Sequence, residues 1–305
     1  MDYFKKVEES IKFAWKYKTL WLFGFLISLF GSEGVSNQYN TNSNSGNEKL
    51  DGAYDKVADL FEEPAFIAFV IVAICLGLIV ALVGWYITSV SKAALINAVK
   101  MEQKGEEPTF KKGWKYGKTK ALDFIKLDLI ALLLGLVIVL FLIPIIIICI
   151  VFPPLLCLLC LGIPVFIIGA ILWWMTLNAA QRYIVLKDMS AMESLKAGWK
   201  LTKTKIVTYF TAGLVSLIPG CLWGIIIFPL GLLAAVAVIF ILIGVVSSSP
   251  VIGLIILASV IFSFSLLVAV VNSPYTVFVY TYWTKVLMEL MDGKADTKVS
   301  NKDEK

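Results

Sequence analysis

The chain has 305 residues, of which 59% are apolar and 16% are charged, against about 45–50% and about 25% in ordinary soluble domains. Polar groups cannot cover that much apolar surface, so we expect lipid to be the solvent for much of the chain. Histidine is absent, which removes the commonest general base, metal ligand and pH switch together. The formal net charge of +5 is small, so its distribution along the chain is more informative than its size.

Six transmembrane spans are predicted from the apolar runs, because a span needs ~20 apolar residues. The first run, residues 19–30, gives only ~18 Å of helix, and it crosses only if the aromatic residues before it extend it. The run 206–246 contains Pro219 and Pro229 and fits either one kinked helix or a span followed by a re-entrant segment. The other predicted spans cover residues 65–90, 129–151, 155–180 and about 250–282.

Prolines mark the predicted breaks between and within these spans. Pro153 and Pro154 predict a tight hairpin between the third and fourth spans. The Ser247–Pro250 stretch predicts a turn, and Pro274, after Asn272 and Ser273, predicts a kink in the last span. The predicted fold class is therefore all-α, a polytopic transmembrane helical bundle.

Basic residues fix the expected orientation. Of the 27 Lys and Arg residues, 25 fall in segments that a six-span path places on one side, and only Lys49 and Lys56 fall in the loop 31–64 with its seven acids. By the positive-inside rule both termini are predicted to be cytoplasmic. The loop 31–64 is then extracytoplasmic, with a mobile first half and a short amphipathic helix in its second half. Residues 1–290 are predicted to form a single transmembrane domain, and 291–305 a disordered cytoplasmic tail.

An internal repeat accompanies these spans. Residues 113–120 read GWKYGKTK and residues 198–205 read GWKLTKTK, so six of eight positions match at an offset of 85. Residues 11–19 are a looser copy. Three two-span units are predicted, at about 4–100, 101–190 and 191–290.

The repeated motif has the composition of a cytoplasmic membrane interface. Trp suits the headgroup level, and each Lys near an anionic leaflet adds about 1 kcal/mol of attraction. Two interpretations stay open: anchors that fix the tilt of the next span, or a specific site for a lipid headgroup or a membrane partner. Nucleic-acid binding is not expected. The predicted lipid-interface residues are Trp15, Lys16, Lys111, Lys112, Trp114, Lys115, Lys118, Lys120, Lys196, Trp199, Lys200, Lys203 and Lys205.

Polar residues within the spans are few. Asn178, Gln181, Arg182 and Asn272 form a candidate polar pathway, and the alternative interpretation is that they make hydrogen bonds between helices or lie at span ends. No catalytic motif is present, so no enzyme, cofactor or metal site is predicted. The pair Cys157 and Cys160 lies in an apolar run, where small packing residues are expected rather than metal ligands.

The opening FAWKYKTLWLFGFL, residues 13–26, together with the recurring GWK segments before spans, resembles a broad group of uncharacterised prokaryotic membrane proteins. That group looks related to the membrane domain attached to some glycerophosphodiester phosphodiesterases. The resemblance implies an architecture and a plasma-membrane location. The catalytic barrel of those enzymes has no counterpart here, so no activity carries over.

Three functions follow as hypotheses. The leading one is a non-enzymatic plasma-membrane protein that engages anionic lipid or a membrane partner, including a second copy of itself, through its basic interfacial helices. The rival is a small transporter or exporter of an apolar or amphipathic solute. The third is an accessory subunit of a lipid-modifying enzyme.

Overall fold

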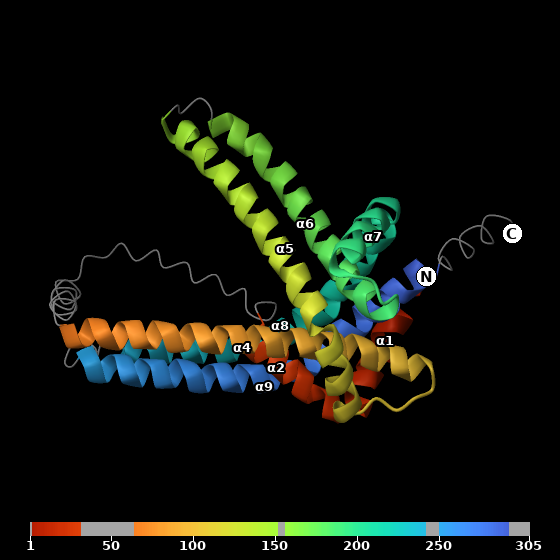
Figure 1. The fold of residues 1–305 in the computed structure, drawn as a ribbon, viewed down its shortest axis with the longest axis horizontal. Helices are drawn as coiled ribbons and strands as arrows, with labels where there is room; N and C mark the ends of the chain where they lie inside the picture. Colours follow the sequence, from red (N-terminus) through yellow and green to blue (C-terminus); the bar gives the residue numbers. More distant parts are fainter. Residues whose placement is uncertain (1, 32–63, 152–155, 242–249, 293–305) are drawn as a thin grey trace, which may run out of the picture. The chain divides into compact units, whose positions relative to one another are not determined.

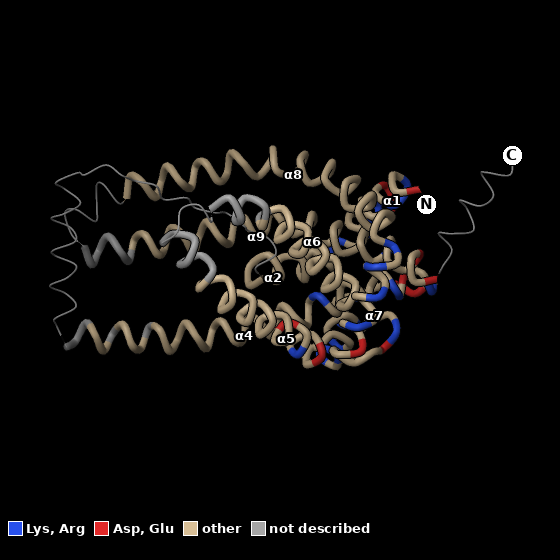
Figure 2. Tube along the Cα trace, turned by 90° about the horizontal axis from the view of Figure 1, so that it is seen from above, with Lys and Arg blue, Asp and Glu red and all other residues tan. Residues whose placement is uncertain are grey.

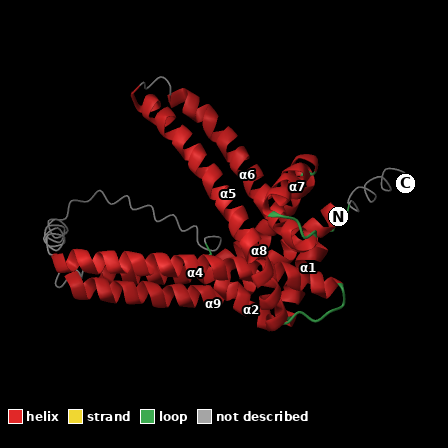
Figure 3. Ribbon diagram, viewed as in Figure 1, coloured by secondary structure: helices red, strands yellow, loops and turns green. Residues whose placement is uncertain are grey.

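The computed structural model describes residues 2–31, 64–151, 156–241 and 250–292. These residues form helices joined by short loops, with no strand among them (Figure 3). Several predictions fall outside the described residues: the structure of the loop 31–64, the Pro153–Pro154 hairpin, the turn at Ser247 and the tail. In chain order the elements are α1 (Tyr3–Lys16), η1 (Lys18–Leu20), α2 (Trp21–Phe30), α4 (Pro64–Gln103), α5 (Phe110–Val151), α6 (Leu156–Leu186), α7 (Ala191–Thr204), α8 (Ile206–Ile241) and α9 (Pro250–Met291) (Figure 1).

Five of these helices are long and apolar enough to cross a membrane. The relevant stretches are Val70–Gln103, Phe110–Pro144, Pro164–Leu186, Ile206–Ile241 and Ile256–Met291. The shortest has 23 residues, ~35 Å of helix, which exceeds the ~30 Å of hydrocarbon in a bilayer. The all-α fold and its multi-pass membrane character are thus confirmed for the described residues.

The structure also refines the predicted boundaries. The run that begins at Ile206 is one continuous helix to Ile241, with Pro219 and Pro229 inside it. The predicted span 65–90 continues to Gln103, so α4 carries a basic end as well as an apolar stretch. The helix at the first predicted span, α2, is much shorter than the five long helices. It has 10 residues, which is ~15 Å of helix, and is too short to cross hydrocarbon alone.

The chain divides into two compact units. Unit 1 comprises residues 1–19, 89–217 and 278–305, and unit 2 comprises residues 20–88 and 218–277. Every Lys, Arg, Asp and Glu that the structure describes belongs to unit 1. The described stretches of unit 2 are uncharged throughout, as the tan tubes in Figure 2 show for α2 and for the apolar lengths of α4, α8 and α9.

Unit 2 packs through small residues and a closed polar cluster. A Cβ on Gly24 in α2 would collide with the Ser273 carbonyl oxygen in α9, so these two backbones touch. Close backbone contact at small residues is a usual way for helices to associate in lipid. Phe23 and Ile27 of α2 are also buried here, so α2 is fixed in this unit although it is short.

Unit 1 holds the larger core, and α7 shows how its helices dock. Gly198 of the second GWK motif lies where a Cβ would be 2.7 Å from the Thr176 carbonyl oxygen of α6. Beside it, the Thr176 hydroxyl donates to the Thr202 hydroxyl at 3.4 Å. Gly117 in α5 also lies against backbone, because a Cβ there would be 2.3 Å from the Val90 carbonyl oxygen of α4. Each of these two Trp-bearing segments therefore packs a small residue against the helix that precedes it.

Substituting Gly198 tests this docking. Gly198→Ala is expected to destabilise the protein by about 1–3 kcal/mol, because the new methyl group meets backbone that cannot move freely. The measurement is the thermal unfolding midpoint of the full chain in detergent. The matched control is Gly169→Ala in α6, where nothing lies within 4 Å of the added Cβ and where Ala favours the helix. Equal midpoints for the two variants would contradict the packing described.

Candidate functional site

Two Trp residues, the half-buried Trp114 and the exposed Trp199, each carry a Lys on the following helical turn. In α5 the Lys118 ammonium lies 5.7 Å from the centre of the Trp114 ring, and in α7 the Lys203 ammonium lies 4.7 Å from Trp199. Both distances are within the ~6 Å range of a cation–π contact. The spacing of four residues places each pair on one helix face. Each pair presents an apolar ring and a positive charge side by side.

The third predicted interfacial segment, in α1, uses different contacts. Trp15 is 58% exposed, and the Lys16 ammonium lies 5.1 Å above the ring of Tyr17. Asp2 accepts a hydrogen bond from the Lys5 N–H at 3.1 Å and so caps the start of this helix. The exposed Phe4, Ile11 and Trp15 line one side of α1 at spacings of seven and four residues, which gives an apolar stripe.

The predicted lipid-interface lysines separate into two groups. Most are exposed, as a membrane contact requires: Lys16, Lys111, Lys112, Lys115, Lys118, Lys196, Lys200 and Lys203. Lys205 is half-buried at the C-terminal cap of α7. Lys120 is also half-buried, and its ammonium pairs with Asp188 and lies 3.9 Å from Asp123. Lys120 therefore holds unit 1 together, which the sequence pattern did not predict.

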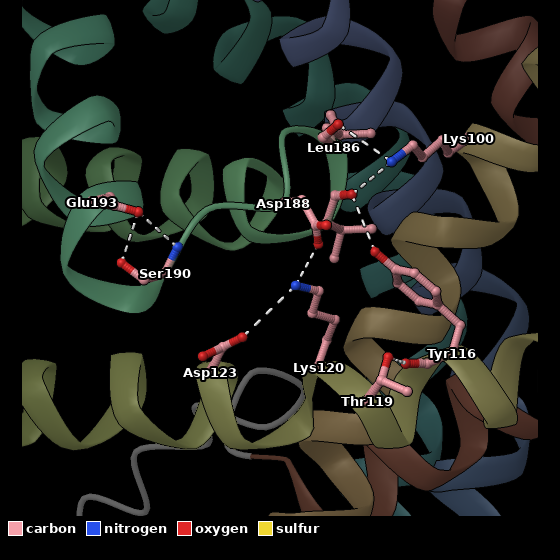
Figure 4. Close-up of polar contacts among 10 residues, drawn as sticks. Lys100, Tyr116, Thr119, Lys120, Asp123, Leu186, Asp188, Ser190 and Glu193 are labelled. Carbon is pink, nitrogen blue, oxygen red and sulfur yellow. Dashed lines mark hydrogen bonds and ion pairs between the residues drawn. The ribbon is translucent and has the colours of Figure 1, made fainter.

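Asp188 lies in the turn between α6 and α7. This turn is part of a polar cluster of unit 1 (Figure 4). Its φ of 60° is in the left-handed region, which Asp tolerates better than most residues. The Lys100 ammonium of α4 donates to the carbonyl oxygens of Val185 at 2.9 Å and Leu186 at 3.3 Å. The Tyr116 hydroxyl also donates to the Val185 oxygen, at 3.3 Å. The last carbonyls of α6, which have no partner within their own helix, are thereby satisfied.

The start of α7 is fixed in the same cluster. The Ser190 N–H and hydroxyl both donate to the Glu193 carboxylate, at 3.1 and 2.9 Å. These hydrogen bonds hold the pKa of Glu193 below its ordinary value. A carboxylate in the first turn also interacts favourably with the helix dipole. The turn from Leu186 to Ser190 is thus held at both ends.

A second cluster of charges joins α1, α4 and α9. The Lys6 ammonium lies 2.6 Å from the Glu289 carboxylate, and Lys285 lies 3.2 Å from Glu102 and 3.9 Å from Glu9. The Lys285 side chain is only 10% exposed, so leaving it unpaired would be costly. A cavity of about 470 Å³ opens beside these pairs. Three of the four lysines that line it, Lys6, Lys12 and Lys285, are paired with acids. The cluster therefore joins distant parts of the chain.

The four candidate pathway residues belong to two different units. The Arg182 guanidinium in unit 1 donates to the Asn178 carbonyl oxygen at 3.0 Å and to the Gln181 side chain at 3.4 Å, and it stacks 5.2 Å from the ring of Tyr280. Asn272 belongs to unit 2. Side-chain hydrogen bonds are made by Gln181, Arg182 and Asn272, whereas the buried side-chain oxygen of Asn178 has no hydrogen-bond partner within the part of the chain that the structure describes.

Asn272 is the centre of the polar cluster in unit 2. The Trp223 indole N–H donates to the Asn272 side-chain oxygen at 3.0 Å, and the Asn272 amide donates to the Ser28 hydroxyl at 3.4 Å. Ser28 and Thr276 share a hydrogen bond of 2.9 Å. The chain of bonds connects α2, α8 and α9, and it satisfies the groups that lipid could not.

Metal and thiol chemistry have little support in the described residues. No group of three or more Cys, Asp and Glu side chains there could hold a metal ion. Cys75 and Cys221 are free and exposed on apolar helices. The side chains of Cys157 and Cys160 lie outside the described part.

One family model matches the chain, over residues 13–295, and it is described as a family of unknown function (DUF7544). The match covers most of the sequence, so the chain belongs to this family. No curated protein and no solved structure matches the chain. The family match assigns no activity to the chain.

The ion pair at Asp188 predicts a pH dependence. The hydrogen bond and charge of Lys120 hold the pKa of Asp188 below its ordinary value. A carboxyl with a lowered pKa in the folded chain stabilises it above the unfolded value of about 3.9, and this contribution disappears as pH falls through the lowered pKa.

We therefore expect Asp188→Asn to have a slightly lower unfolding midpoint than the native chain at pH 7, with the difference vanishing in acid. Asn keeps the left-handed backbone accessible, so the variant changes the charge and little else. Thermal unfolding between pH 7 and pH 3 measures this. A difference that persists or grows at low pH would show that the carboxylate charge is not the cause.

The cluster around Asn272 predicts an energetic coupling across unit 2. Trp223→Phe and Asn272→Leu each leave a polar group without its partner, so each is expected to destabilise, with a coupling of about 0.6–2 kcal/mol, as measured for hydrogen bonds between membrane helices. A double-mutant cycle on the unfolding midpoint in detergent gives the coupling. Ser265→Ala in α9, whose hydroxyl only donates to the Ile261 carbonyl of its own helix, is the matched control. Additive effects would contradict the hydrogen bond.

Proposed function

We propose that this member of the family is a non-enzymatic, multi-pass plasma-membrane protein that engages anionic lipid through its basic, Trp-bearing helices. The observation that carries the proposal is the recurrence of a Trp with an exposed Lys beside its ring, at Trp114 with Lys118 and at Trp199 with Lys203. An indole beside an ammonium suits the boundary between headgroups and hydrocarbon. A membrane partner or a second copy of the chain is the alternative occupant of the same surface.

The finer architecture is part of this proposal. We infer six membrane crossings built from three two-span units, with both termini in the cytoplasm. The first crossing includes the aromatic residues before α2, because α2 alone is too short. The charge distribution supports this orientation, because 25 of 27 basic residues fall on the side we assign to the cytoplasm. Gly113 and Gly198, which the offset of 85 aligns, are both buried, and this supports related units. The resemblance to the membrane domain of glycerophosphodiester phosphodiesterases is in keeping with an architecture that carries no catalytic machinery of its own.

The exposed lysines at the start of α5 provide the test. Replacing Lys111, Lys112 and Lys115 with Gln is expected to lower the retention of anionic lipid, by roughly fivefold for each lysine at low salt, since each contributes about 1 kcal/mol near an anionic surface. Native mass spectrometry of the full chain, purified from vesicles of phosphatidylglycerol and phosphatidylcholine, measures the retained lipid.

Two controls make the result specific. Lys12→Gln removes one exposed charge from a lysine that is already paired with Glu8 at 2.6 Å, so it is expected to change retention little. High salt should reduce the difference between the native chain and the triple variant. An unchanged lipid complement in the triple variant would contradict the proposed function.

A further inference from the structure

A smaller cavity of unit 1 is lined by none of the residues of the Trp–Lys pairs. Its volume is about 280 Å³, near the lower end of the range for small-molecule sites. The ends of three helices meet there: α4, α6 and α9. The cavity, which we call the three-lysine cavity, is lined by Lys100, Gln103, Lys104, Leu186, Lys187, Met288, Met291 and Asp292.

The two outer lysines occupy equivalent places at helix ends. Lys104 follows the last residue of α4, and the next residue, Gly105, has a φ of 78°. The Gly105 N–H donates to the Glu102 oxygen and the Glu106 N–H to the Met101 oxygen, both at 3.0 Å. These are the two hydrogen bonds of a Schellman cap. Hydrogen bonds within the α4 terminus therefore set the backbone position of Lys104.

Lys187 is placed by a related arrangement. It follows the last residue of α6, its N–H donates to the Tyr183 oxygen at 3.1 Å, and the next residue, Asp188, is in the left-handed region. The Asp188 carboxylate is directed to Lys120, as Figure 4 shows. Its ion pair is with a lysine that does not line the cavity, and it attracts Lys100 without forming an ion pair with it.

The three-lysine cavity has an excess of positive charge. Three lysines line it against one acid, Asp292, which leaves a net charge of +2. Neither Lys104 nor Lys187 makes an ion pair within the part of the chain that the structure describes. Lys100 uses two N–H groups on the carbonyls of Val185 and Leu186, and an ammonium has three. The three ammonium groups repel one another, and a bound anion would offset this repulsion.

We propose that the three-lysine cavity binds a phosphate monoester group, held by Lys100, Lys104 and Lys187. A phosphate monoester carries about −1.5 to −2 charges at pH 7 and has three strong acceptor oxygens. This charge matches the +2 of the cavity. A phosphodiester carries a single charge and matches it less well. The Gln103 amide supplies a further donor, and the flexible, apolar Met288 and Met291 suit the carbon part of the ligand.

Helix capping alone does not account for all three lysines. A cation near a helix C-terminus is favourable, and Lys100 clearly has this role, since it binds the α6 carbonyls. The Schellman bonds already satisfy the carbonyls at the end of α4 without the Lys104 side chain. The Lys104 and Lys187 side chains are exposed and directed to the same cavity.

The proposal is independent of the proposed function, because none of its lysines belongs to the interfacial set. The decisive variant is Lys104→Gln with Lys187→Gln, and the matched control is Lys5→Gln with Lys18→Gln, which removes the same charge from exposed lysines outside the interfacial set. Both lysine pairs are exposed, so folding should be retained, and the unfolding midpoint without ligand verifies this. Lys104→Arg with Lys187→Arg keeps the charge and should restore binding at least in part.

The experiment has two arms, because the phosphate group can come from solution or from a lipid. In the first, inorganic phosphate is titrated into the full chain in phosphatidylcholine nanodiscs, against chloride at equal ionic strength. In the second, native mass spectrometry compares retained phosphatidic acid, a monoester, with phosphatidylglycerol, a diester. Loss of two charge-assisted hydrogen bonds should weaken binding by about tenfold or more in the decisive variant.

Each outcome is informative. A phosphate response that the decisive variant loses and the control keeps supports a site for free phosphate. Preferential retention of phosphatidic acid, lost in the decisive variant alone, supports a headgroup site. No binding in either arm, equal retention of the two lipids without a phosphate response, or equal losses in the two variants would overturn the proposal. If Lys111 and Lys112 govern lipid retention while both arms fail, the proposed function stands and this inference does not.

Discussion

The cost of placing an ionised side chain in hydrocarbon is the constraint on which the rest of this structure depends. Every described charge lies in unit 1, and the described stretches of unit 2 contain none. Polar groups in unit 2 are neutral and bonded to one another, as at Asn272 and Trp223. Among the buried charges of unit 1, Lys285 lies beside carboxylates, and Arg182 donates to carbonyl and amide oxygens. The cost of an unpaired charge in hydrocarbon thus explains both the uncharged lengths of the helices and the ion pairs at their basic ends.

The same constraint explains which features could be predicted from the sequence. Apolar length depends on composition over ~20 residues, so the long helices were predicted, although Ile206–Ile241 could not be resolved as one helix until its backbone was seen. The Lys285–Glu102 pair joins residues 183 positions apart. No local pattern indicates such a contact, since it depends on how α4 and α9 meet. The short length of the first apolar run was evident from the sequence, and the structure gives α2 10 residues there.

Lys118 and Lys120 show why the candidate site was only partly predictable. They are two residues apart, and on a helix that separation is about 200°, so they face opposite directions. Lys118 is exposed and lies over the Trp114 indole, whereas Lys120 pairs with Asp188. The basic composition of the segment does not distinguish the two lysines, so both were predicted to lie at the lipid interface. The helical period separates them, and the decisive partner, Asp188, lies on another element in a left-handed conformation that only the backbone shows.

The ends of α4 and α6 raise an electrostatic question that the contacts answer. The C-terminal end of a helix carries partial negative charge and should repel an anion. At α6, however, Lys100 and Tyr116 occupy the last carbonyls, and at α4 the Schellman bonds do so. The negative ends are therefore already compensated within the fold, and the ammonium groups of Lys104 and Lys187 remain in excess beside the cavity. Such an excess is stable at a solvent-exposed helix end and unstable in hydrocarbon, which accounts for its location among the charged elements of unit 1.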